Sequence, residues 1–88
     1  MHADSKKISR ELKIARGQLD GILRMVDEDR YCVDISNQLL ATLALLKKIN
    51  QEILREHIRG CVREGLGCSE DNPKVEEALK LLEKLATT

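Results

Sequence analysis

The sequence predicts an all-α protein with three helices, of which the central helix is much the longest. Apolar residues recur at spacings of three and four along most of the 88-residue chain, which is the spacing of one helix face. No segment alternates apolar and polar residues as a half-buried strand does. The length fits one small domain, which we place over residues 1–88.

The first helix is expected at about residues 5–28, with Asp4 or Ser5 as its cap. Its apolar stripe consists of Ile8, Leu12, Ala15, Leu19, Ile22 and Val26. Gly17 and Gly21 stand four residues apart within it, where each glycine costs up to ~1 kcal/mol relative to alanine. The pair indicates either tolerated flexibility or the close approach of another helix.

The second helix is expected at about residues 31–64, after the polar break at 27–30. It has no Pro or Gly before Gly60 and carries apolar residues at Ile35, Leu39, Leu43, Leu46, Ile49, Ile53 and Ile58. A helix of about 30 residues is about 45 Å long. A chain of 88 residues with one aromatic side chain has little bulk to cover such a helix, so we expect an oligomer.

The third helix is expected at about residues 73–86. The polar run at 68–72 indicates a loop, after which Asn72 can cap a helix that has Pro73 in its first position. One face of this helix carries Val75, Ala78, Leu79, Leu82 and Leu85.

Composition argues against several classes of function. Hydrophobic residues make up 42% and charged residues 34%, which is too apolar for a disordered chain and too polar for a membrane protein. We see no transmembrane helix or signal peptide and therefore expect a cytoplasmic protein without a membrane partner. No activated nucleophile, paired catalytic carboxylates or Gly-rich phosphate loop is visible, so we expect no enzyme.

Three side chains form a candidate metal site: Cys32, His57 and Cys61. His57 and Cys61 are four residues apart, so they share a helix face and can bind one metal ion. Cys32 precedes His57 by 25 residues, or ~37 Å along a continuous helix. The three cannot meet within one chain on such a helix. The alternative is that the cysteines are small buried hydrophobes and His57 a satisfied polar residue.

Two copies of the second helix, packed antiparallel about a two-fold axis, would bring the three residues together. The crossing would be centred near residue 45 or 46, in the apolar patch Leu43–Leu46. A two-fold interface creates two identical sites. Two thiolates and one imidazole favour Cu(I), whereas Zn(II) would need a fourth ligand.

A basic face on the first predicted helix is a candidate for binding phosphates. The chain has no net charge, but residues 6–24 carry six basic side chains against two acidic ones. The candidate contacts are Lys6, Arg10, Lys13 and Arg16, with Lys47 and Lys48 as a second cluster. Such residues bind phosphates without stacking on bases. The alternative is an ordinary solvated helix surface.

Residues 15–25, 30–35 and 57–62 resemble the CsoR/RcnR family of bacterial metal-sensing repressors. The resemblance covers residues 6–86. It implies antiparallel dimers that form a four-helix bundle, and two such dimers that pair into a homotetramer. The resemblance also implies that the metal-free homotetramer binds double-stranded operator DNA and releases it when the cross-protomer site is occupied. Cys32, His57 and Cys61 match the Cu(I)-sensing branch, in which residues matching Tyr31 and Glu77 surround the metal ligands.

Other effectors within this family match less well. Nickel and cobalt sensors use a histidine near the N-terminus, for which His2 is available, but they usually carry histidine at the position of Cys61. Aldehyde sensors lack that cysteine, and persulfide sensors lack the histidine that matches His57. Oxidation between Cys32 and Cys61 remains chemically possible. Cys68 fits no ligand position of the family.

One position departs from the family pattern. Glu11 stands where a basic residue is usual, immediately before Leu12, and this weakens the match of the DNA-binding face. Because the chain has no net charge, a helical adaptor that carries copper without binding DNA is an alternative outside the repressor class, although the basic first helix argues against it. Salt-dependent binding to promoter DNA separates the two.

Overall fold

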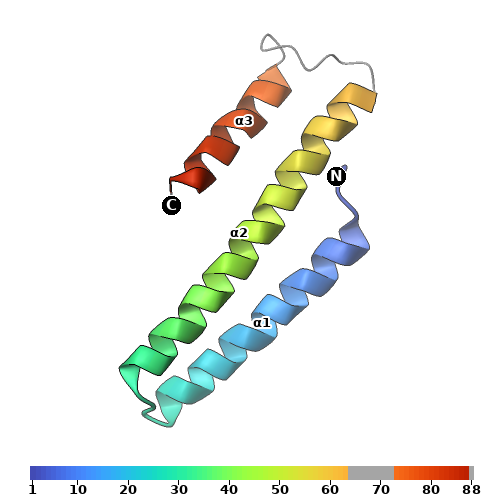
Figure 1. Ribbon diagram of the computed structural model, residues 1–88. Helices are drawn as coiled ribbons and strands as arrows, with labels where there is room; N and C mark the ends of the chain where they lie inside the picture. Colours follow the sequence, from blue (N-terminus) through green and yellow to red (C-terminus); the bar gives the residue numbers. More distant parts are fainter. Residues whose placement is uncertain (64–72, 88) are drawn as a thin grey trace. The chain divides into compact units, whose positions relative to one another are not determined.

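The computed structural model describes residues 1–63 and 73–87, which form three α-helices (Figure 1). These are α1 (Ser5–Asp27), α2 (Cys32–Arg63) and α3 (Pro73–Ala86). Within the described residues there is no strand, and the predicted all-α class with one long central helix is confirmed. α1 ends one residue earlier than expected, and α2 begins one residue later.

α1 ends in a hydrogen-bonded turn. The amide of Arg30 donates to the carbonyl of Met25 at 2.9 Å, and the amide of Asp29 donates to the carbonyl of Val26 at 3.1 Å. This pair of hydrogen bonds is the Schellman motif, which needs a left-handed residue after the helix. Asp29 supplies it with φ 52°, a conformation that short polar side chains tolerate. The polar break is thus a defined turn between α1 and α2.

α2 begins at Cys32, one of the three candidate metal ligands. The amide of Ile35 donates to the carbonyl of Tyr31 at 3.2 Å, which places Tyr31 at the N-cap and Cys32 at the first helical position. Asp34 in the first turn interacts favourably with the positive end of the helix dipole. Cys32 therefore lies at one end of α2, and His57 and Cys61 lie near the other.

The chain divides into two compact units, of which the first to be described is Lys6–Ile49. In it α1 runs antiparallel to the first half of α2 (Figure 1). Ile8, Ala15 and Ile22 are buried along α1, and Thr42 is buried on α2. The Thr42 hydroxyl donates to Oε1 of Gln18 at 2.8 Å, which links the two helices through a partly buried polar contact.

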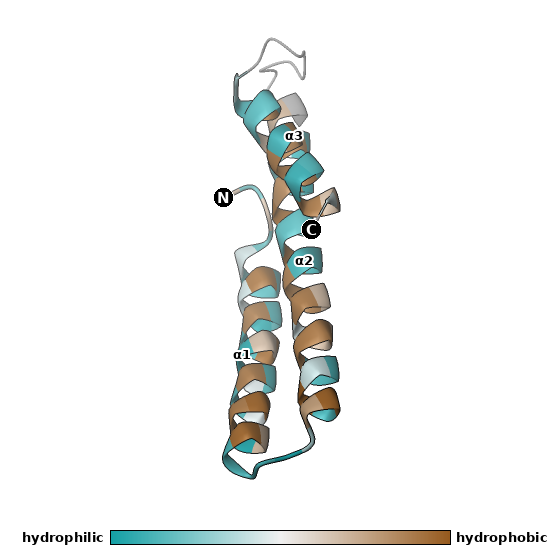
Figure 2. Ribbon diagram, turned by 90° about the vertical axis from the view of Figure 1, so that its left-hand side faces the viewer, coloured by the Kyte–Doolittle hydropathy of each residue, from teal (hydrophilic) through white to brown (hydrophobic). Residues whose placement is uncertain are grey.

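This unit leaves a large apolar surface uncovered. Ile8, Ala15 and Ile22 are buried, but the other half of the predicted α1 stripe (Leu12, Leu19 and Val26) is exposed. Exposed apolar residues continue along α2 at Val33, Leu39, Leu40, Leu43 and Leu46. Figure 2 shows hydrophobic residues along both helices of this unit. An apolar face of this extent is typical of an interface between chains.

The second unit consists of Met1–Ser5, the part of α2 from Asn50 onwards, and α3. Here α3 runs antiparallel to the end of α2 (Figure 1). The buried side chains are Leu54 and Cys61 of α2, Val75 and Ala78 of α3, and Ala3 of the N-terminal segment. This small core holds α3 and the N-terminal segment against the part of α2 that carries His57 and Cys61.

Gly17 and Gly21 are open positions in the described chain. A Cβ atom added at either would meet no heavy atom within 4 Å, so no helix of the same chain approaches them there. The close approach that the sequence suggested would therefore have to come from another molecule.

Candidate functional site

His57 and Cys61 lie on the same face of α2, one turn apart. Cys61 is only 1% exposed, and its thiol is free. His57 is half-buried. The helix thus supplies an imidazole and a thiol at the spacing that one metal ion can bridge, and the thiol is shielded from solvent.

His57 also lines a pocket between α2 and α3. The pocket has a volume of about 460 Å³, and its walls are Ile53, Leu54, Ala78, Leu81, Lys80 and Glu77 together with His57. The walls are mostly apolar, and the exposed Glu77 side chain lies on the same pocket as the half-buried His57 imidazole. The structure thus brings Glu77 and His57 to one pocket.

The N-terminal segment packs on the opposite flank of His57. The rings of His2 and His57 are 5.7 Å apart, centroid to centroid, at an interplanar angle of 61°. The His2 ring also lies against Gly60, since a Cβ atom added there would collide with it. The sequence gives no periodic signal for this contact, because residues 1–4 precede the first helix.

Cys32 is the first residue of α2, far along the helix from His57 and Cys61, and Tyr31 immediately precedes it. The side chains of Cys32 and Tyr31 are both exposed, with Tyr31 at 68%. In the described ranges of a single chain, no three His, Cys, Asp or Glu side chains gather as a metal site. If Cys32, His57 and Cys61 bind one ion, two chains have to supply them. Cys68 lies outside the described residues.

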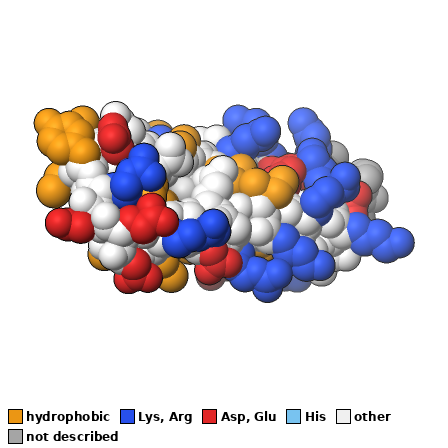
Figure 3. All heavy atoms as spheres, turned by 90° about the horizontal axis from the view of Figure 1, so that it is seen from below, with side chains coloured by type: hydrophobic (Ala, Val, Ile, Leu, Met, Phe, Trp, Pro, Cys, Tyr) orange, Lys and Arg blue, Asp and Glu red, His pale blue; other side chains and the backbone are white. Residues whose placement is uncertain are grey.

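The candidate DNA contacts on α1 are exposed. Lys6, Arg10, Lys13 and Arg16 all have solvent-accessible side chains. Figure 3 shows Lys and Arg side chains gathered on one side of the view, with acidic and apolar side chains more frequent on the other. The exposed basic side chains of α1 supply positive charge of the kind that attracts phosphates.

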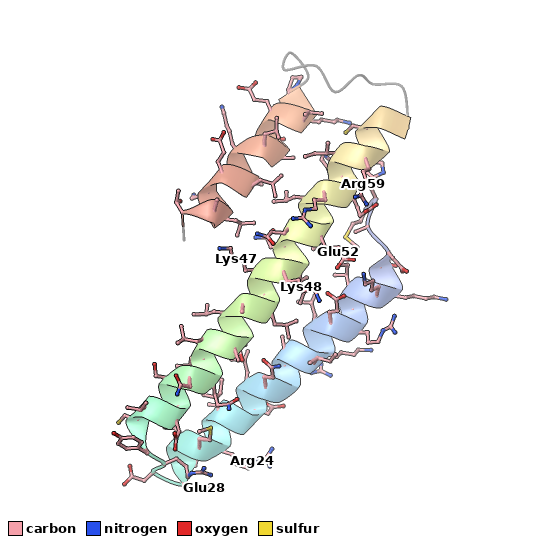
Figure 4. The ribbon with its side chains drawn as sticks, in the orientation of Figure 1. Arg24, Glu28, Lys47, Lys48, Glu52 and Arg59 are labelled. Atoms are coloured by element: carbon pink, nitrogen blue, oxygen red, sulfur yellow. The ribbon has the colours of Figure 1, made fainter. Side chains whose placement is uncertain are left out.

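Lys47 and Lys48 do not form one compact cluster. Lys48 is exposed and Lys47 half-buried, and their side chains leave α2 on different sides (Figure 4). Consecutive helical residues are about 100° apart around the axis, which separates the two ammonium groups.

Glu11 is partly withdrawn from the basic surface. Its side chain is 16% exposed and lies 4.0 Å from the ammonium group of Lys7. Its second carboxylate oxygen is buried without a hydrogen-bond partner. The Glu11 carboxylate therefore lies beside Lys7 and is largely shielded from solvent.

Residues 4–84 match the model of a family described as metal-sensitive transcriptional repressors. The chain belongs to this family. The match covers α1, α2 and all but the last residues of α3. Members of this family are transcriptional repressors that respond to metals, and not enzymes.

Curated relatives of the chain are named for copper. The copper-sensing transcriptional repressor CsoR of Bacillus subtilis (strain 168) is 35% identical over 86 residues, which cover 94% of this chain and 85% of the relative. CsoR of Mycobacterium ulcerans (strain Agy99) is 48% identical over 50 residues, covering 57% of this chain and 43% of the relative. The chain thus matches less than half the length of the mycobacterial protein.

A solved structure shares the fold. The nickel-responsive transcriptional regulator InrS superposes with a TM-score of 0.69 over 99% of this chain and 93% of that chain, at 22% sequence identity. At this level of identity, the similarity shows only that the two proteins share an all-α fold. No helix in the described ranges combines the length and the apolar character needed to cross a bilayer.

Proposed function

We propose that this repressor binds operator DNA when it is metal-free and releases the DNA when it binds Cu(I). The observation that carries this proposal is the position of three side chains on α2. His57 and Cys61 share one face near its end, whereas Cys32 is exposed at its start. The copper-sensing relatives support the choice of metal.

The donor set fits Cu(I). Cys32 of one protomer and His57 and Cys61 of another would hold it through two thiolates and one imidazole. Soft thiolates select Cu(I), which accepts a low coordination number, whereas structural Zn(II) is almost always four-coordinate. When bound, Cu(I) supplies a soft centre that joins two protomers. The burial of Cys61 is suited to protecting such a centre from water.

The uncovered apolar surface supports an antiparallel dimer. The pairing that places Cys32 opposite His57 and Cys61 is centred near residue 45 or 46. Leu39, Leu40, Leu43 and Leu46 lie around this centre, and between 38% and 60% of each side chain is exposed in the single chain. A second α2 would cover them and complete a four-helix bundle with both α1 helices. Two such dimers would form the homotetramer.

Cu(I) binding can cause DNA release only if Cu(I) binds more tightly to the state of the protein that does not bind DNA. His57 is placed for this role because it contacts the pocket that Glu77 of α3 lines. A carboxylate near the imidazole would fix its tautomer and orientation. It would also link the position of α3 to the occupancy of the site. Tyr31, next to Cys32 at the start of α2, would approach the same pocket from the other protomer.

Replacing Glu77 with glutamine is expected to lower the Cu(I) affinity by about 10–100-fold, since outer partners of metal-ligating histidines have effects of this size. Competition with a Cu(I) chelator of known affinity measures the change. Glu76→Gln is the matched control, because Glu76 pairs with Lys80 at 3.3 Å on the same helix and does not line the pocket. Equal losses in the two variants would contradict the assigned role of Glu77.

The proposed function is tested by titrating the reduced protein with Cu(I) under anaerobic conditions and measuring its binding to promoter DNA. DNA release at one Cu(I) per protomer supports the proposal. Zn(II) and Ni(II) are titrated in parallel. Release by Ni(II), a persulfide or an aldehyde, without a response to Cu(I), would assign another effector. Failure to bind DNA under every condition would favour a copper-carrying adaptor.

A nickel-responsive repressor is the second candidate. The contact between the His2 and His57 rings favours it, because it places a second imidazole beside the candidate ligands. Imidazole is a good ligand for Ni(II). If this candidate is correct, His2→Ala abolishes DNA release by Ni(II). If Cu(I) is the effector, His2→Ala leaves release at saturating Cu(I) intact.

A further inference from the structure

The N-terminal segment lies over part of the helix face that carries the proposed metal ligands. His57, Gly60 and Cys61 are spaced i, i+3 and i+4, so they form one continuous patch on α2. The His2 ring contacts two members of this patch, His57 and Gly60. Ala3 is buried at 5% exposure. The segment is thus docked on α2 beside the third member of the patch, Cys61.

Gly60 forms a notch that this docking requires. A Cβ atom at position 60 would fall on three atoms of the His2 ring. The ring can occupy this place only because position 60 has no side chain. By contrast, a Cβ atom at Gly17 or Gly21 would meet nothing within 4 Å. Gly60 is therefore the glycine in the described chain at which a close approach is built into the structure.

The Cys61 side chain is only 1% exposed. Part of the structure that covers it therefore has to move before Cys61 can bind an ion or contact a second chain. α3 covers one flank of this part of α2 and is anchored by the buried Val75 and Ala78. The N-terminal segment covers the other flank with four residues that precede α1. A segment of four residues with one buried side chain, Ala3, opens at lower free energy than helices with several buried apolar contacts.

We propose that residues 1–4 act as a strap that closes the His57–Cys61 pair in the metal-free protein and is held by the notch at Gly60. The importance of this strap for sensing rests on the proposed function, since it controls access to the same pair. The reactive fraction of Cys61 then equals the fraction of molecules in which the strap has lifted. Residues 2 and 60 set that fraction without being required as Cu(I) ligands.

The strap is tested by the rate at which N-ethylmaleimide alkylates Cys61 in the reduced, metal-free protein. Cys32→Ser and Cys68→Ser are introduced first, which leaves Cys61 as the single thiol of the three in the chain. Gly60→Ala expels the His2 ring and is expected to accelerate alkylation by about tenfold or more, as the open fraction rises. Gly21→Ala is the matched control and leaves the rate unchanged.

His2→Ala provides a second route to the same opening and keeps the test valid if Gly60→Ala disturbs folding. It is also expected to accelerate alkylation. Because both substitutions release one strap, the double variant reacts no faster than the faster single variant. Helicity and the unfolding midpoint confirm that the helices are intact. Unchanged alkylation in His2→Ala, with the helices intact, would overturn the proposal.

This experiment distinguishes the strap from the proposed function because it uses neither metal nor DNA. If alkylation accelerates but Cu(I) does not bind through Cys61, the strap is retained and the copper site is wrong. If Cu(I) binds through Cys61 but neither variant accelerates alkylation, the copper site is retained and the strap is wrong. Stopped-flow mixing with Cu(I) then shows whether the faster variants also bind the metal faster.

Discussion

Cys61→Ala is expected to abolish DNA release by Cu(I) while the protein remains folded and bound to operator DNA. Removing the thiolate leaves one imidazole and one thiolate at the proposed site. Outer partners of metal ligands already change affinity by about 10–100-fold, so loss of a ligand itself should lower it by more than about 100-fold. The measurement is DNA binding of the reduced variant across a Cu(I) titration.

The fold should tolerate this change. Cys61 is buried, and alanine keeps the helix while removing one sulfur atom, so the cost is that of a small cavity. Cys32→Ala is expected to show the same loss of response, since it removes the other thiolate. Cys68→Ala is the control and should respond as the unmodified protein does. Loss of DNA binding in a folded Cys61→Ala protein would contradict the separation of metal and DNA sites.

Replacing Arg10 and Lys13 together with alanine is expected to have the largest effect on operator binding. Both side chains are exposed on α1, and every protomer of an oligomer repeats them. Each lost phosphate contact lowers the magnitude of the slope of log affinity against log salt by about 0.9 on duplex DNA. The affinity should therefore fall at low salt, and the salt dependence should become shallower. Fluorescence anisotropy with labelled promoter DNA measures both quantities.

Replacing Lys74 and Lys84 of α3 together with alanine also removes two exposed positive charges and serves as the control for net charge. It should leave the salt slope unchanged. The Arg10 and Lys13 variant should also keep its Cu(I) stoichiometry, because neither residue belongs to the proposed metal site. If the double variant binds promoter DNA with an unchanged salt slope, the α1 face is not the phosphate-binding surface.

The helices could be predicted from the sequence because their causes are local. Apolar spacing, the polar break at 27–30 and Pro73 each act within a few residues, and the structure places helix ends beside them. Which half of the α1 stripe is buried could not be predicted. Ile8 and Leu12 are equally apolar, and only the position of α2 makes one buried and leaves the other exposed.

In the candidate site, too, some features could be predicted from the sequence and others could not. The shared face of His57 and Cys61 follows from a spacing of one helical turn. The pocket that joins His57 to Glu77 depends on the packing of α3, and it was expected only from the family resemblance. The docking of His2 at Gly60 and the withdrawal of the Glu11 carboxylate are tertiary effects. Neither has a periodic or compositional signal.

The central claim is that two protomers share each Cu(I) site, and mixed dimers test it most directly. One chain carries Cys32→Ala and the other Cys61→Ala, with different affinity tags so that the mixed dimer can be isolated. Neither homodimer retains a complete site. In the mixed dimer, Cys32 from the second chain meets His57 and Cys61 of the first, so one of the two sites is whole.

The account predicts one tightly bound Cu(I) per mixed dimer and none in either homodimer. A mixed dimer that binds Cu(I) no better than the homodimers, while the unmodified dimer binds two, would contradict it.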